Sequence, residues 1–105
     1  MTQAQLLQHI KNHAMDLYGD RFRGLVLYGS VARGEAGEDS DLDLLCLLEG
    51  PVDIIRETLR LTGDLYALQL QYLEMPISVK AVDVADYERG AYPLVIEARK
   101  EGVLV

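Results

Sequence analysis

The segment from Asp41 to Leu48 reads DLDLLCLL, and it constrains the fold more than any other part of this sequence. Residues two apart on a strand share a face. Asp41 and Asp43 therefore share one face with two leucines, and the other face carries Leu42, Leu44, Cys46 and Leu48. A strand that is apolar on both faces is buried on both faces. This segment is therefore predicted to lie inside a sheet that is covered on each side.

The two aspartates at the start of this strand predict a cation site. Buried carboxylates are unfavourable unless an opposite charge compensates them. The Cα atoms of Asp41 and Asp43 are expected about 6.5–7 Å apart, from a rise of ~3.3 Å per residue. Side chains at this spacing can converge on one hard cation or bridge two. Mg²⁺ is the natural ion, because it takes one or two carboxylates and completes its shell with water and phosphate oxygens. Taken alone, a capped acidic strand end explains the pair equally well.

A glycine turn precedes the acidic strand. Leu25–Tyr28 is a short apolar run bounded by glycines, which predicts a buried strand, and Gly29 and Ser30 follow it directly. Glycine lets the backbone approach a ligand, and amides that open a turn point at anions. The Ser30 hydroxyl and the Arg33 guanidinium could bind the same phosphate, or Arg33 could pair with a nearby aspartate. Together with the two aspartates, these residues predict a site for a nucleoside triphosphate and its Mg²⁺.

The remaining elements follow from periodicity and from turn residues. Thr2 is expected to cap a first helix that runs to about Tyr18. The pattern then predicts a helix from Val52 to about Glu74, which Gly63 could interrupt, and a strand from Ile77 to about Val84. A polar stretch around Asp86–Gly90 follows, and after it a helix through Ala98 and a short apolar tail, Val103–Val105.

The long predicted helix carries two neighbouring apolar rows, and both are expected to cover the sheet as one broad face. One row contains Ile54, Leu61, Leu65, Leu68 and Tyr72, and the other contains Ile55, Leu59, Leu70 and Leu73. The fold class that follows is α/β (α+β), a small mixed sheet packed by helices in a single domain over residues 1–105.

Composition narrows the class of protein. A single cysteine excludes an internal disulfide. The sequence shows no signal peptide and no apolar run long enough for a membrane helix. Together these features favour a cytoplasmic protein. The formal charge of −7 and the scattered basic residues argue against direct nucleic-acid binding. His9 and His13 have a spacing that zinc sites use, but no third ligand is evident, and Cys46 reads as a buried inert thiol.

A known family carries the same motif. Gly29-Ser30, ten intervening residues and Asp41-Leu42-Asp43 resemble the GS–x10–DxD motif of the DNA polymerase β-like nucleotidyltransferase superfamily. Residues around the motif, the long helix and the closing Gly102–Val105 resemble its minimal bacterial and archaeal members. The resemblance implies the polymerase β-like palm fold, catalytic and metal-binding roles for Asp41 and Asp43, and ATP phosphates on Gly29, Ser30 and Arg33.

The resemblance also implies a partner and a reaction. Minimal members are often encoded beside an HEPN-domain RNase toxin, and in that family they act as antitoxins by moving AMP from ATP to a tyrosine of the toxin. Active members carry a third carboxylate on the next strand, where this chain places Ser78. Asp83 is the only acid on that strand, but its odd spacing from Ser78 puts it on the opposite face. Either the register differs and Asp83 serves as the third carboxylate, or the site has only two.

Two functions of different classes remain open at this point. One is a Mg²⁺-dependent transfer of AMP from ATP to a protein hydroxyl, which the intact motif favours. The other is a binding module that neutralises a partner or senses nucleotide without turnover, which Ser78 favours. An aminoglycoside-type transferase is a distant third, because 105 residues leave little room for a small-molecule acceptor pocket unless a homo-oligomer builds one.

Overall fold

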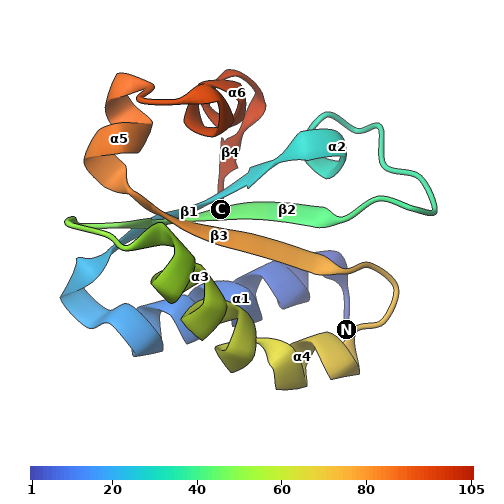
Figure 1. Cartoon of the computed structure of the whole chain (residues 1–105). Helices are drawn as coiled ribbons and strands as arrows, with labels where there is room; N and C mark the ends of the chain where they lie inside the picture. The colour runs from blue at the N-terminus through green and yellow to red at the C-terminus, as the bar shows by residue number, and fades with distance from the viewer.

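A computed structural model describes all 105 residues, which form a four-stranded sheet between two layers of helices (Figure 1). The strand order is β3-β2-β1-β4. β2 pairs antiparallel with β1 and parallel with β3, and β4 pairs antiparallel with the other side of β1. The strands span Phe22–Tyr28 (β1), Leu42–Leu48 (β2), Ile77–Asp83 (β3) and Val103–Leu104 (β4). The predicted small mixed sheet is confirmed.

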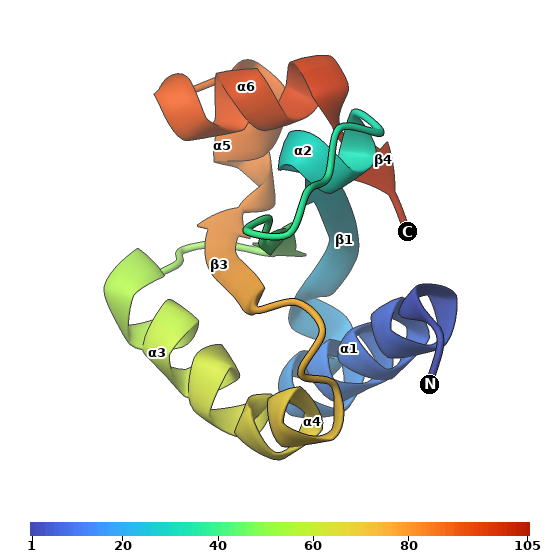
Figure 2. The ribbon, with the colours of Figure 1, turned by 90° about the vertical axis from the view of Figure 1, so that its right-hand side faces the viewer.

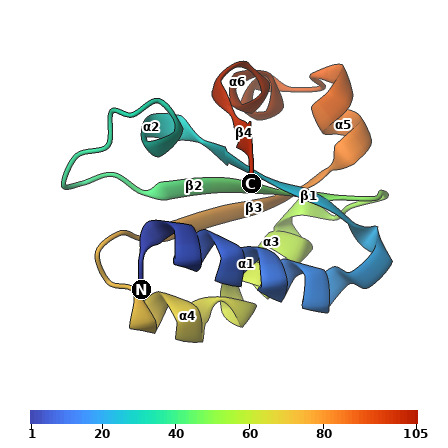
Figure 3. The same ribbon diagram turned by 180° about the vertical axis from the view of Figure 1, so that it is seen from behind.

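Helices cover both faces of the sheet, as the doubly apolar β2 requires. One face carries α1 (Gln3–Tyr18), α3 (Ile54–Asp64) and α4 (Tyr66–Gln71), and the other carries α2 (Gly29–Ala32), α5 (Val84–Arg89) and α6 (Pro93–Glu101). Figure 1 shows the first group below the sheet and the second above it, and Figure 3 shows the same division from behind. A 3₁₀ turn, Gly19–Arg21, links α1 to β1.

The side chains of β2 separate into the two predicted sets. Leu42, Leu44, Cys46 and Leu48 belong to a core cluster of 15 buried residues, which the layer of α1, α3 and α4 completes. Leu45 and Leu47 belong to a second cluster of 7, which includes residues of α6. Because β2 is a central strand between two apolar clusters, its position and register are strongly specified.

The first helix begins where the sequence predicts. The Thr2 hydroxyl accepts a hydrogen bond from the Gln5 amide at 3.1 Å, and the Gln5 side chain accepts one from the Thr2 amide at 2.8 Å. This reciprocal pair is a capping box, which satisfies two of the free amides at a helix start. The helix ends at Tyr18, also as predicted.

The predicted helix from Val52 to Glu74 is wrong in its continuity and in one of its two apolar rows. It forms two helices that break at Leu65 rather than at Gly63. Leu61, Leu65 and Leu68 are buried, but the second row faces solvent. A helix presents a stripe roughly 100° wide to a sheet, and the second row lies outside it. The exposed side chains, here called the outer stripe, are Ile55 (75%), Leu59 (68%), Tyr66 (65%), Leu70 (56%) and Leu73 (76%).

The C-terminal region contains two elements that the sequence reading missed. The polar stretch around Asp86 is the short helix α5, which Asp83 caps and Gly90 ends with a left-handed backbone. The apolar tail forms the edge strand β4, in which Leu104 pairs with Val26 of β1. A two-residue strand that pairs with a segment almost 80 positions away leaves no signal in the neighbouring sequence, because only the tertiary fold brings β4 to β1.

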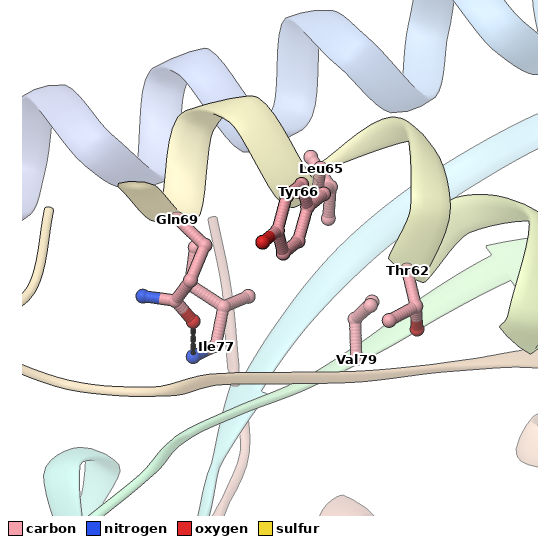
Figure 4. A pocket seen from close by; sticks show the side chains of 6 residues that line it. All are labelled: Thr62, Leu65, Tyr66, Gln69, Ile77 and Val79. Atoms are coloured by element: carbon pink, nitrogen blue, oxygen red, sulfur yellow. Dashed lines mark hydrogen bonds between the residues drawn. The ribbon is translucent and has the colours of Figure 1, made fainter. Parts of the chain in front are cut away.

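A small cavity lies between the α3–α4 layer and β3 (Figure 4). Its volume is 80 Å³, well below the roughly 300–1,000 Å³ of ordinary small-molecule sites. The Gln69 side chain at its rim accepts a hydrogen bond from the Ile77 amide at 2.6 Å and so covers the free edge of β3. The lining residues are Thr62, Leu65, Tyr66, Gln69, Ile77 and Val79. None of the helices is both long and apolar enough to cross a bilayer.

Candidate functional site

The two halves of the sequence motif meet at one end of the β1–β2 pair. β1 runs directly into α2, whose first residue is Gly29, and Tyr28 pairs with Asp43 across the antiparallel strands. The strand register thus places the end of β1 beside the start of β2, although a long exposed loop separates them in sequence. Figure 2 shows α2 and this loop on the same side of the sheet as α6. We call Gly29, Ser30, Arg33, Asp41 and Asp43 the GS–DxD site.

Gly29 is required at its position for two reasons. Its φ is +77°, a left-handed conformation that residues with a Cβ rarely adopt. A Cβ built there would overlap the Oδ2 of Asp43 and lie 3.1 Å from its Cγ. The carboxylate of Asp43 therefore packs directly against the glycine Cα, and the acid and the turn form one centre.

Asp41 and Asp43 differ in their surroundings. Asp41 is exposed and lies in the loop just before β2, so the observed strand begins one residue later than predicted. Asp43 is half-buried on the strand. Burial, and then the charge of Asp41, raise the pKa of Asp43 above its ordinary value, while Lys80 and Arg33 act in the opposite direction. The two carboxylates are thus close enough to repel each other, and a bound cation would remove that repulsion.

Arg33 binds two glutamates rather than an aspartate. Its Nη1 donates to Glu101 Oε2 at 2.8 Å, and its Nε donates to Glu35 Oε2 at 3.1 Å. The other oxygen of Glu101 accepts a hydrogen bond from the Gly29 amide at 3.0 Å. Ser30 follows Gly29 as a half-buried residue of α2, in the same turn that leads to Arg33.

The structure does not bring Asp83 to this centre. Ser78 pairs in register with Asp43, whereas Asp83 pairs with Leu48 at the other end of the parallel pair, where β3 leads into α5. Asp83 has a structural contact there, because its Oδ1 accepts a hydrogen bond from the Ala85 amide at 2.8 Å and caps α5. No group of three or more potential metal-binding side chains forms anywhere in the chain. β3 therefore contributes no carboxylate to the acidic pair, and the one further acid that acts on Asp43 is Glu101 of α6, whose charge raises the pKa of Asp43.

Lys80 and Glu101 were missed by the sequence reading. Lys80 lies two residues after Ser78 on β3, and the period-2 pattern alone would have placed it on the face of Asp43. Glu101 reaches Gly29 across 72 positions, and nothing in the sequence near either residue indicates the contact.

His13 and Cys46 are other polar candidates from the sequence, and the structure shows the surroundings of each. His13 lies 3.0 Å from the carboxylate of Asp64 at the surface, without further metal-binding neighbours. Cys46 is fully buried in the larger core cluster, and burial raises the pKa of its thiol to about 12. Neither residue belongs to the GS–DxD site.

The donor set of the site suits a hard divalent cation. Two carboxylates separated by one residue match the share of protein ligands that Mg²⁺ takes, with water and phosphate oxygens as the rest. The site is an open surface, because none of the cavities in the protein is lined by its residues. A ligand would therefore be held by charge and hydrogen bonds rather than by enclosure.

Comparisons with known proteins place this geometry in a family. The model of the nucleotidyltransferase domain family matches residues 10–104. No curated protein sequence matches the chain significantly.

Solved structures share the fold at low sequence identity. A protein of Sulfolobus solfataricus, assigned provisionally as a nucleotidyltransferase, has a TM-score of 0.64 and 17% identity over 95% of this chain and 76% of its own. A toxin-antitoxin with AMP-PNP has a TM-score of 0.59 and 18% identity over 92% and 70%. A mutant of the toxin-antitoxin MntA-HpeT has a TM-score of 0.58 and 16% identity over 100% and 72%. With 95 of its residues matched by the family model and its fold shared with these structures, the chain belongs to the nucleotidyltransferase domain family.

Proposed function

We propose that this chain is a Mg²⁺-dependent nucleotidyltransferase that moves AMP from ATP to a hydroxyl of a partner protein, and that it acts as the antitoxin of an HEPN-domain toxin. The observation that carries the proposal is the contact of Asp43 with Gly29. It joins the acidic pair and the glycine turn in one centre, which is the arrangement that a nucleotide with a bound cation needs. The toxin-antitoxin structures among the neighbours support the antitoxin role.

In this proposal each part of the triphosphate has a partner. Asp41 and Asp43 hold the Mg²⁺, which supplies neutralisation of the phosphate charge. The Ser30 hydroxyl and the Arg33 guanidinium bind phosphate oxygens by hydrogen bonds, and those from Arg33 are charge-assisted. The acceptor oxygen forms a bond to the α-phosphorus as the bond to the bridging oxygen breaks and pyrophosphate leaves. The protein contributes positioning and charge stabilisation rather than a covalent intermediate.

A protein acceptor fits the shape of the site better than a small molecule does. None of the cavities in the protein is lined by residues of the GS–DxD site. A protein that carries the acceptor hydroxyl brings its own surface to the reaction. The outer stripe, which lies on α3 and α4 apart from Leu73 just after α4, supports such a partner, since large exposed apolar side chains occur at interaction surfaces.

One observation favours the alternative, a binding module without turnover. Ser78 stands in register with Asp43, where active members are expected to carry their third carboxylate. Without that group, β3 offers no carboxylate to accept the proton of the attacking hydroxyl, and the proton would pass to solvent. The consequence is slower chemistry, whereas nucleotide binding through Asp41 and Asp43 is retained.

Transfer of label from α-³²P-ATP to a co-expressed HEPN-domain partner separates the two functions. Asp43→Asn removes one carboxylate of the acidic pair, and Asp39→Asn makes the same chemical change at an exposed residue of the loop that precedes β2. We expect the wild type and Asp39→Asn to label the partner, and Asp43→Asn to lose at least roughly 100-fold in rate while the complex still forms.

Two results would count against the enzymatic proposal. Labelling that survives in Asp43→Asn would show that another protein or another site does the chemistry. A complex that forms with the wild type but never incorporates label would favour the binding module.

A further inference from the structure

Glu101 contacts two parts of the GS–DxD site at once. One carboxylate oxygen accepts a hydrogen bond from the Gly29 amide at 3.0 Å, and the other accepts one from Arg33 Nη1 at 2.8 Å. These partners lie 72 and 68 positions away in sequence and bracket the turn that carries Ser30. A single side chain from the last turn of α6 therefore joins the start of the turn to its end.

The backbone that carries Glu101 is held on both sides. The Gly102 amide donates to the Ala98 carbonyl at 2.7 Å, which closes α6, and a Cβ at Gly102 would lie 2.6 Å from Val26 Cγ1. Immediately afterwards β4 pairs with Val26 and Leu27 of β1. β1 is the strand that leads directly into Gly29. Glu101 is thus anchored to the same strand whose end it contacts, and its position relative to the turn is set by the sheet.

The pair with Glu101 differs from an ordinary surface ion pair. The Glu101 side chain is 16% exposed, whereas that of Glu35, the second partner of Arg33, is 68% exposed. Arg33 and the Gly29 amide hold the pKa of Glu101 below its ordinary value. Exposed pairs restrict a side chain weakly, but a covered carboxylate with both oxygens in use defines a direction for the guanidinium.

Held in this way, Arg33 still has donors to spare. A guanidinium has five N–H groups, and Glu101 and Glu35 contact only Nη1 and Nε, so Nη2 has no protein partner. The charge of Arg33 also lowers the pKa of Asp43, which shows that the guanidinium lies within electrostatic reach of the acid. An arginine fixed before its ligand arrives loses less rotamer freedom on binding.

We infer that Glu101 is a positioning residue, which acts through Arg33 to hold its guanidinium ready for the phosphates of the nucleotide. The inference rests on the proposed function, since it concerns the same site. It assigns to Glu101 no contact with the nucleotide and no part in the chemistry. The opposite effect on nucleotide affinity is equally measurable. If Glu101 competed with phosphate for Arg33, removing Glu101 would tighten nucleotide binding.

The test is a double-mutant cycle on the affinity for Mg²⁺-ATP, measured by calorimetry. Glu101→Gln keeps an oxygen that can accept from the Gly29 amide but loses the charge that holds Arg33. We expect it to weaken binding about 3- to 10-fold, and to change the affinity by less than about twofold when Arg33 is already alanine. Glu97→Gln, the same change one turn earlier on the exposed side of α6, is expected to bind like the wild type.

A second readout separates positioning from a loss of structure. Glu101→Gln is expected to weaken Mg²⁺-pyrophosphate as much as Mg²⁺-ATP, and to leave the thermal midpoint within about 3 °C of the wild type. An affinity equal to or tighter than that of the wild type would overturn the inference, as would an equal loss in the Arg33→Ala background. If the wild type itself binds neither ligand, the proposed function fails and the inference fails with it. If the wild type binds and Glu101→Gln binds equally well, only the inference fails.

Discussion

Replacing Gly29 with alanine tests whether the glycine turn and Asp43 form one unit. The backbone at Gly29 has a φ of +77°, which costs a residue with a Cβ roughly 1–2 kcal/mol. The new methyl group would also overlap Asp43 Oδ2 and lie 3.2 Å from its Cβ. Displacing the carboxylate from its rotamer adds roughly 0.5–1.5 kcal/mol. The expected loss in unfolding free energy is therefore about 1.5–3.5 kcal/mol.

Gly34 supplies a matched control for this substitution. Its φ is +73°, close to that of Gly29, but a Cβ there would meet no atom within 4 Å. Gly34→Ala should therefore show the backbone penalty alone, about 1–2 kcal/mol. At roughly 4–8 °C per kcal/mol, thermal unfolding should fall by about 10–20 °C for Gly29→Ala and by about half as much for Gly34→Ala.

The cycle with Asp43→Ala isolates the contact itself. Once the carboxylate is gone, Gly29→Ala should destabilise the protein no more than Gly34→Ala does. Equal midpoints for the two glycine variants in the wild-type background would refute the reasoning. So would a loss at Gly29 that does not change when Asp43 is removed.

Three further predictions concern single side chains. Burial and the charge of Asp41 raise the pKa of Asp43. The Asp43 carboxyl therefore stabilises the fold most at low pH, and this contribution is lost as the pH rises through the raised pKa. Mg²⁺ binding, which needs the ionised carboxylate, should instead weaken as the pH falls through the same value. Asp41→Asn should lower that pKa, as a ¹³C NMR titration of the Asp43 carboxyl would show, and an unchanged titration would mean that the two acids do not interact. Ser78→Asp places a carboxylate from β3 beside Asp43, and the repulsion should destabilise the metal-free protein by about 1 kcal/mol. The same substitution should increase the rise in melting temperature on adding Mg²⁺. A smaller rise than in the wild type would contradict the register of β2 and β3. Cys46, whose thiol has a pKa of about 12, should react with a disulfide reagent at pH 8 only as the chain unfolds, and rapid stoichiometric labelling of the native protein would show that the strand is not buried.

The local parts of the fold could be predicted because their signals lie within a few residues. The alternation in β2 indicates two buried faces, and burial on both sides fixes its register. Thr2 and Gln5 carry a helix start in four residues. The glycine turn and the acidic pair are each local patterns, and the antiparallel pairing of β1 with β2 brings them together at Tyr28 and Asp43.

The parts that could not be predicted depend on tertiary contacts. Both apolar rows of the helix predicted from Val52 to Glu74 have helical spacing, and only the packing geometry decides that Leu61 is buried while Leu59 is exposed. The pairing of β4 with β1 and the reach of Glu101 to Gly29 span most of the chain. A side chain that completes a site from such a distance looks in the sequence like any charged residue near a helix end.

Calorimetric titration of ATP into the protein, with and without Mg²⁺, tests the central claim most directly. The account predicts that the wild type binds ATP only with Mg²⁺ and that the Asp41→Asn/Asp43→Asn variant loses this binding, while Asp39→Asn retains it. Binding that is independent of Mg²⁺, or that survives in the double variant, would contradict the claim that the two carboxylates and the Gly29 turn form one nucleotide site.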